Sequence, residues 1–298
     1  MSVSRTTLST SRPVSGVPFL AAAGVLWGTG GLFGSMLATA TGLSSIAVAA
    51  YRLGVGGGLL CVFLLLTGRF VLRGRAAVLR VAATGALAAL FQASYFAAVT
   101  MTSVSIATLV TIGSSPVLVL LARPRAATWR SLVSVALALV GLALLVGLGD
   151  DGAGNVVAGS VFAVIAASGF VAMTLMAGRP VAGLDAPTTT GAAFAFGGLL
   201  LAVLAGPAGL GFTPSAATIG LLAAFGLVPT ALAYTAYFRG LQTAPASVGA
   251  LLALLEPLTA AVLAAVLLGD RLGVVGVIGG VVLGVAVVIG ANQRARSS

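Results

Sequence analysis

Two charged side chains lie inside long apolar stretches of the sequence, and these are the residues best placed to do chemistry. Glu256 stands near the middle of the apolar stretch 248–268, directly before Pro257, and Arg52 stands in the stretch 46–66. A charged group in the core of a bilayer costs roughly 3 kcal/mol or more unless it is paired or faces water. Both residues are therefore predicted to recognise a charged solute or to couple its movement to an ion.

The two charges allow two arrangements. Counted from the same side of the membrane, Arg52 lies roughly 9 Å deep and Glu256 roughly 18 Å deep, at about 1.5 Å per residue. If the helices are neighbours, the long arginine side chain can reach the acid and form a buried ion pair, which keeps Glu256 ionised. Otherwise Arg52 extends to the lipid headgroups and Glu256 stands alone in a wet cavity, where a protonated carboxyl group suits proton coupling.

A row of hydroxyl groups follows one helix in the first half of the chain. Ser105, Thr108, Thr111 and Ser115 fall within a wedge of roughly 120° when the helix turns by about 100° per residue. Such a row can line a cavity, or it can bond to the carbonyls of its own helix and hold neighbouring helices together.

Aromatic and amide side chains occur at similar depths. Tyr234 follows Pro229, which frees a backbone carbonyl and can kink a helix, and Gln92 and Tyr95 stand three residues apart. Trp27 lies too deep for the usual interfacial belt, so it either packs or lines a pocket. The predicted cavity-lining residues are Trp27, Arg52, Gln92, Tyr95, Thr108, Thr111, Ser115, Tyr234 and Glu256.

The composition is that of an integral membrane protein. Of 298 residues, 59% are hydrophobic and 7% charged, whereas soluble domains carry roughly 25% charged residues. The chain has no histidine and one cysteine, Cys61, so we predict no catalytic residues, no metal and no cofactor, and we do not expect an enzyme. The net charge of +10 does not indicate nucleic acid, because the arginines lie between apolar segments.

We predict an all-α fold with ten transmembrane helices. The apolar segments span residues 19–37, 46–66, 81–98, 104–121, 132–148, 156–177, 191–205, 217–238, 248–268 and 272–289. Residues 1–17 and 292–298 are predicted to form cytoplasmic tails, the first of them disordered.

The arginines predict the orientation. With ten spans and a cytoplasmic N-terminus, thirteen arginines fall in inside regions and one, Arg271, falls outside, together with Asp150 and Asp151. This asymmetry satisfies the positive-inside rule and places both termini in the cytoplasm. The lysine-free composition, rich in alanine, glycine and arginine, suggests a bacterial source with a high GC content.

The chain repeats itself. The segment 95–116 aligns with 237–257, so that Tyr95 falls on Tyr237, Ser105 falls on Ser247, and the final prolines agree within one residue. Residues 18–150 and 151–291 are therefore predicted to form two units of five spans. Because five is odd, the second unit is inverted relative to the first, and a central cavity is expected at their interface.

Glycines have two predicted structural roles. The runs Gly54-Val-Gly-Gly-Gly58 and 276–280 are typical of faces where helices pack closely. In Gly269-Asp270, the glycine suits the end of the ninth span and the aspartate can cap the start of the tenth.

The chain resembles the drug/metabolite transporter superfamily, and in particular its EamA-type members with ten helices. The resemblance covers residues 18–291. It rests on Leu26-Trp27-Gly28, Tyr51-Arg52-Leu53, the repeated aromatic-to-proline segments and the sequence Leu267-Leu-Gly-Asp-Arg-Leu272. The family usually ends the ninth span with Gly-Glu-Arg, whereas Asp270 stands here, and the first half lacks this ending altogether.

The resemblance implies a secondary transporter of the inner membrane that exports small polar metabolites, often amino acids, by alternating access. A multidrug or lipophilic-cation exporter is the alternative, because one buried acid among aromatic rings would suit a cation; a membrane-embedded lipid-handling protein is a third reading. The expected partners are a small-molecule substrate, the lipid bilayer and a coupled proton, and the sequence is compatible with a monomer or a homodimer.

Overall fold

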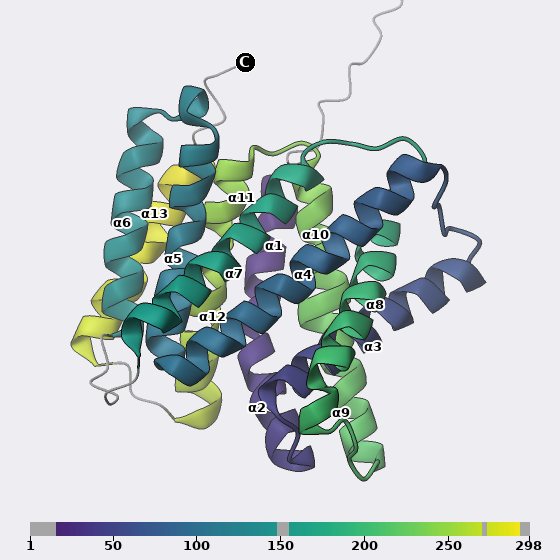
Figure 1. Cartoon of the computed structure of the whole chain (residues 1–298). Helices are drawn as coiled ribbons and strands as arrows, with labels where there is room; N and C mark the ends of the chain where they lie inside the picture. Colours follow the sequence, from purple (N-terminus) through teal and green to yellow (C-terminus); the bar gives the residue numbers. More distant parts are fainter. Residues whose placement is uncertain (1–15, 148–154, 270–272, 293–298) are drawn as a thin grey trace, which may run out of the picture.

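The computed structural model describes residues 16–147, 155–269 and 273–292 (Figure 1). Outside these ranges lie nearly all of the two predicted tails and four residues on which predictions were made. These are Asp150, Asp151 and Arg271, predicted to face the outside, and Asp270, predicted to cap the tenth span. The helices are α1 (Val17–Gly28), α2 (Gly30–Thr41), α3 (Ser45–Leu66), α4 (Arg75–Met101), α5 (Val104–Ala122), α6 (Trp129–Val146), α7 (Val156–Ala177), α8 (Ala186–Ala205), α9 (Ala216–Gly226), α10 (Ala233–Leu241), α11 (Ala246–Leu252), α12 (Leu255–Leu263) and α13 (Val274–Ala291).

These helices combine into ten spans that are long and apolar enough to cross a membrane, which confirms the predicted number. Most bounds agree within a few residues, but the third span is longer than predicted and begins at Arg75 instead of residue 81. Three spans are interrupted: α1 and α2 form the first, α9 and α10 the eighth, and α11 and α12 the ninth. The predictions treated each of these three as one apolar segment.

Polar residues define where many helices begin. In each case a side-chain oxygen accepts a hydrogen bond from a backbone N–H of the first turn, which has no partner within the helix. The capping residues are Ser44, Ser103, Thr128, Asn155, Asp185 and Ser215. At the other end of the ninth span, Gly269 adopts the left-handed conformation that was predicted for it (φ 73°).

The packing of the spans follows a two-fold pattern. The second span contacts the seventh (α3 with α8), and the fifth contacts the tenth (α6 with α13). Where α4 packs on α7, the equivalent α10 packs on α1; where α5 packs on α7, the equivalent α12 packs on α1. Each of these contacts is therefore matched by a contact between the equivalent spans of the other repeat, where equivalent spans are five positions apart in the chain. Two repeats related by a two-fold axis require this pattern.

Glycines form the closest of these contacts. A Cβ built at Gly57 would collide with the backbone of α8 at Ala195, and one built at Gly279 would collide with the backbone of α6 at Leu145. The predicted close-packing role of both glycine runs is thus confirmed. The outer surface of the bundle is apolar, with Val203 77% and Val281 62% exposed, as expected where helices face lipid.

The two faces of the bundle differ in charge. The chain enters α1 and leaves α13 at one face, which we call the terminal face; the opposite one is the far face (Figure 1). Among the described residues, every arginine except Arg52 lies in or near a connection at the terminal face. They are Arg69, Arg73, Arg75, Arg80, Arg123, Arg125, Arg130, Arg179 and Arg239.

Two adjacent glycines of α3 provide a test of the packing. Gly57→Ala should destabilise the protein by about 1–3 kcal/mol, because its methyl group meets the α8 backbone, which cannot move aside as a side chain can. Thermal unfolding in detergent should show a Tm lower by several degrees. Gly58→Ala is the control, since nothing lies within 4 Å of its Cβ position; equal Tm values for the two variants would contradict the packing described here.

Candidate functional site

The eighth span is distorted at Pro229. Proline has no N–H and its ring displaces the carbonyl four residues earlier, which belongs to Phe225. The chain responds with a π-helical turn over Leu227–Leu232, and the Thr230 hydroxyl donates to the Phe225 carbonyl (3.2 Å). The carbonyl of Pro229 becomes available to a partner from another helix.

That partner is Arg52 of α3. Its Nη2 donates to the Pro229 carbonyl (3.2 Å) and its Nε donates to the Thr230 hydroxyl (3.1 Å). The guanidinium lies over the Phe225 ring, 5.4 Å from its centre, and is partly exposed. Arg52 therefore joins the second span of the first repeat to the kinked span of the second repeat.

The ninth span is broken at Ala253 and Leu254, just before Glu256. Pro257 cannot donate to the Ala253 carbonyl, and the backbone N–H of Glu256 donates to that carbonyl instead (2.9 Å). This tight turn separates α11 from α12 and places Glu256 in the first turn of α12, where a negative charge is favourable. The predicted intramembrane acid thus sits at a helix break and remains partly exposed.

Arg52 and Glu256 lie on either side of the joint between α1 and α2. A Cβ built at Gly28 would come 2.9 Å from the backbone carbonyl oxygen of Glu256, and one built at Gly30 would come 3.6 Å from Nη2 of Arg52. At Gly28 only a hydrogen atom fits, whereas a Cβ at Gly30 would make an ordinary van der Waals contact with Arg52. The joint in the first span therefore lies next to the Arg52 guanidinium and next to the backbone of Glu256.

The structure shows neither of the two predicted arrangements of these charges in full. Within residues 16–147, 155–269 and 273–292, no ion pair within 4 Å joins Arg52 to Glu256, and Arg52 turns to the eighth span rather than to the headgroups. Both charges nevertheless lie within electrostatic range of the hydroxyl groups of Tyr95 and Tyr234. These four side chains therefore share one polar region.

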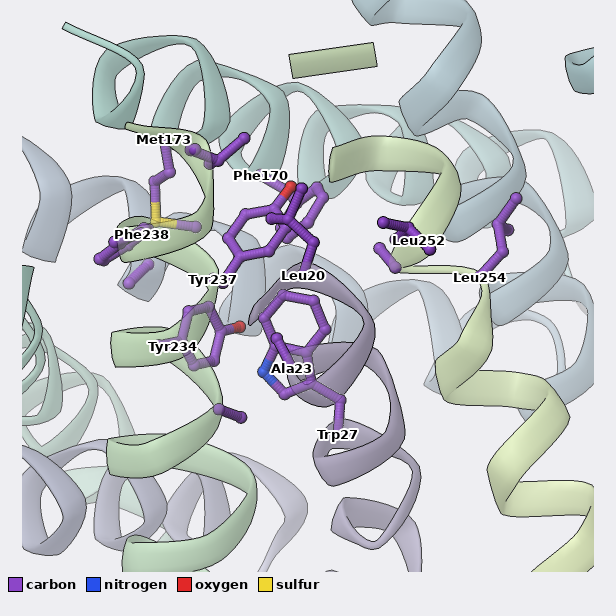
Figure 2. Close-up of a cluster of buried hydrophobic side chains, with 14 of the residues drawn as sticks. Leu20, Ala23, Trp27, Phe170, Met173, Tyr234, Tyr237, Phe238, Leu252 and Leu254 are labelled. Atoms are coloured by element: carbon purple, nitrogen blue, oxygen red, sulfur yellow. The ribbon is translucent and has the colours of Figure 1, made fainter. Parts of the chain in front are cut away.

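Aromatic rings cluster around Trp27 and Tyr234 (Figure 2). Trp27, only 2% exposed, packs against Tyr234 and Tyr237 with ring centres 4.8 Å away in both cases, and against Phe170 at 5.9 Å. Tyr234 in turn contacts Phe194 at 4.5 Å. Rings from α1, α7, α8 and α10 thus meet at the interface of the two repeats.

The hydroxyl groups of Tyr95 and Thr108 are hydrogen-bonded to each other, a contact that the sequence did not predict. Their oxygens lie 2.8 Å apart, between α4 and α5, and both residues are partly exposed. Gln92, one turn before Tyr95, is 3% exposed, and its amide makes no hydrogen bond to another described residue. This corner of the site provides hydroxyl and amide groups near the two charges.

The remaining hydroxyls of α5 are buried. Ser115 donates to the carbonyl of Thr111 (2.9 Å), which is the bond within one helix that was the alternative to cavity lining. Thr111 is 1% exposed, and its own hydroxyl has no partner among the described residues. Ser115 therefore has a structural role, and Thr111 remains a polar group without an assigned function.

Several residues of the site were not predicted. Phe170 and Phe225 are ordinary apolar residues in the sequence. Thr174 has no sequence signal either, and its hydroxyl lies 2.9 Å from that of Tyr237 in the structure. Extending the internal alignment to the first and sixth spans would have paired Phe170 with Trp27. Within the described segments, no three His, Cys, Asp or Glu side chains gather into a group that could hold a metal ion.

Comparison with known proteins shows the family of this chain, and the matched stretches coincide with the two repeats seen in the structure. The EamA-like transporter family model matches residues 14–147 and again residues 157–290, and the chain therefore belongs to the EamA-like transporter family. The two matched stretches begin 143 residues apart, which is also the separation of Trp27 and Phe170. These two rings are thus equivalent positions of the repeats that contact one another.

One related protein and one solved structure are similar to this chain over most of its length. An uncharacterized transporter of Bacillus subtilis (strain 168), YwfM, is 28% identical over 262 residues, which cover 85% of this chain and 86% of the relative. A solved structure described only as a crystal structure of a protein superposes with a TM-score of 0.77 over 92% of this chain and 95% of its own. Its sequence identity of 20% supports the shared fold alone. The protein is thus a multi-pass membrane transporter made of two repeats.

The bridge from Arg52 to the eighth span can be tested by stability. Arg52→Met leaves the Pro229 carbonyl without a donor, and we expect a loss of about 1–3 kcal/mol and a lower Tm of the purified protein. Arg52→Lys keeps the charge and one donor but cannot contact Pro229 and Thr230 with the same fork, so its Tm should lie between the other two. A methionine variant as stable as the wild type would show that the bridge does not hold the two spans together.

Proposed function

We propose that this protein is an alternating-access secondary transporter that exports small polar metabolites, with amino acids as the leading substrate class. The observation that carries the proposal is the pair Arg52 and Glu256, two opposite charges near the joint of the first span and without an ion pair between them. A zwitterionic solute can satisfy both charges at once, its carboxylate at Arg52 and its ammonium group at Glu256.

The interrupted helices support transport at this place. Transporters built from inverted repeats commonly bind solutes near the middle of the bilayer, where broken helices leave backbone groups unpaired. Here the first, eighth and ninth spans are interrupted at Thr29, Pro229 and Ala253–Leu254 respectively. All three interruptions adjoin Arg52 or Glu256.

Glu256 has a second role in this proposal as the acid that couples export to a proton gradient. Its carboxylate makes no hydrogen bond or ion pair to another described residue, so protonation breaks no contact. A carboxyl group that gains a proton when the solute leaves would exchange one for the other. We assign both faces from the arginine distribution, with the terminal face in the cytoplasm.

Export of a lipophilic cation is the second candidate. The rings of Trp27, Tyr234 and Phe170 near a single acid favour it, because aromatic faces and a carboxylate both attract cations. The positive charge of Arg52 in the same region opposes it.

Uptake into proteoliposomes tests both candidates. A panel of radiolabelled amino acids and one lipophilic cation is measured with and without a pH gradient, for the wild type and for Glu256→Gln. For the wild type, we expect the pH gradient to drive uptake of at least one amino acid. In the Glu256→Gln variant, the rate of this gradient-driven uptake should fall by about tenfold or more. Asp185→Asn is the matched control, since asparagine also caps α8 and only a charge at the terminal face is removed.

The outcomes separate the proposals. Uptake of the cation that disappears in Glu256→Gln, with no amino-acid uptake, would replace the leading substrate class by the second one. Amino-acid uptake that ignores the gradient and persists in the variant would remove Glu256 from the coupling mechanism.

The proposed orientation can be measured with a matched pair of cysteines. In a Cys61→Ala background, Ala76→Cys introduces an exposed thiol at the terminal face and Ala208→Cys introduces one at the far face. A membrane-impermeant maleimide added to intact bacterial cells should label position 208 alone. Labelling of position 76 alone would invert the orientation, and permeabilised cells provide the control for reactivity of both sites.

A further inference from the structure

Trp27 carries a hydrogen-bond donor that the protein does not use. The residue is 2% exposed, and its Nε1–H has no acceptor among the described residues. Folded proteins leave few buried donors unpaired, because such a group has lost its hydrogen bonds to water without gaining others. An unpaired donor at the interface of two transporter repeats indicates that its acceptor belongs to something bound there.

A second unused group lies beside it. Tyr234 is 5% exposed, and its hydroxyl makes no hydrogen bond to a described residue. The ring is set nearly edge-on to Trp27, with centres 4.8 Å apart and planes at 62°. Figure 2 shows the Tyr234 hydroxyl pointing toward Trp27 and the indole nitrogen on the side of Trp27 that faces Tyr234.

The two other tyrosines nearby provide a contrast. The hydroxyl of Tyr237 is bonded to Thr174 (2.9 Å), and that of Tyr95 is bonded to Thr108 (2.8 Å). Tyr234 is thus the tyrosine of this region whose hydroxyl remains available to a ligand. Its partner Trp27 can donate but not accept, so a ligand shared by the two must present an acceptor.

A positive charge close to this pair indicates the kind of acceptor. Arg52 binds Pro229 and Thr230, and Thr230 precedes Tyr234 by four residues, about one helical turn. The Arg52 guanidinium therefore stands about one helical turn from Tyr234 along the eighth span. A negatively charged acceptor is favoured at this position.

We propose that the indole N–H of Trp27 and the hydroxyl of Tyr234 form a subsite for the carboxylate of the transported solute, beside Arg52. The subsite rests on the proposed function and narrows it: a solute needs a carboxylate, and an amine without one lacks the acceptor that Trp27 requires. The proposal assigns binding roles to Trp27 and Tyr234 beyond packing.

Fluorescence of Trp27 gives a direct measurement. The chain has two tryptophans, and Trp129 is 78% exposed at the start of α6, so Trp129→Phe leaves Trp27 as the single reporter. The probes are the amino acid that is transported best, or leucine if none is transported, and its carboxamide. We expect the amino acid to change the Trp27 emission at concentrations at least about tenfold lower than the carboxamide does. Equal responses to both would overturn the proposal.

Variants separate binding from packing. Trp27→Phe and Tyr234→Phe should each weaken affinity for the amino acid by about 10- to 100-fold, as expected for a lost hydrogen bond to a charged group, while affinity for the carboxamide changes little. Because Trp27→Phe removes the fluorescent reporter, these affinities are measured by binding of the radiolabelled amino acid and by its competition with the carboxamide. Tyr237→Phe is the matched control in the same ring cluster, and it should change affinity for the amino acid less than about twofold because its hydroxyl is already bonded to Thr174.

The failure of this inference differs from failure of the proposed function. If amino acids are transported but Trp27→Phe and Tyr234→Phe behave like Tyr237→Phe, the function stands and the subsite is wrong; the indole N–H then merely faces the Tyr234 ring, a weak contact. If no amino acid is transported, the proposed substrate class fails. The subsite proposal is then decided by whether leucine changes the Trp27 emission at lower concentrations than its carboxamide does.

Discussion

The structure depends on the requirement that every backbone polar group within a membrane has a partner, because lipid offers none. Pro229 and Pro257 violate that requirement in the eighth and ninth spans. The chain satisfies it again by local means: the Thr230 hydroxyl serves the Phe225 carbonyl, the Glu256 N–H serves the Ala253 carbonyl, and Arg52 serves the Pro229 carbonyl. The two intramembrane charges are thus tied to the places where regular helix cannot continue.

The two repeats share their packing and differ in their chemistry. Pro116 stands in the first repeat near the position of Pro257, yet α5 runs through it without a break, and Ser115 occupies the place before the proline where the second repeat has Glu256. The aromatic pair Trp27 and Phe170 keeps the symmetry at the centre, since both are equivalent positions in direct contact. Symmetry therefore builds the scaffold, and its local loss in the second repeat supplies the breaks in the eighth and ninth spans and the acid, while the first repeat has its own break at Thr29.

Much of the fold was predictable from the sequence because the membrane imposes long apolar spans, and each repeat must bury the same faces. The number of spans, the two units and the close-packing glycines followed from those constraints. The partner of Arg52 did not, because it is a backbone carbonyl, and no side-chain pattern marks which carbonyl a distant proline releases. The break before Glu256 was also missed, since apolar periodicity is the same in an interrupted helix and a continuous one. Ser115 and Thr108 carry the same kind of group on the same helix, and only the three-dimensional neighbours decide that Thr108 meets Tyr95.

In the proposed alternating-access cycle, the Arg52 bridge would have a kinetic consequence. It connects a helix of one repeat with a helix of the other, so a rocking motion that parts these helices must first break two hydrogen bonds. An empty carrier would meet this barrier at every cycle, whereas a solute whose carboxylate attracts the guanidinium would lower it. Such a carrier would reorient faster when loaded than when empty, would favour counterflow of solute over net drainage, and would leak little of its driving gradient in the absence of solute.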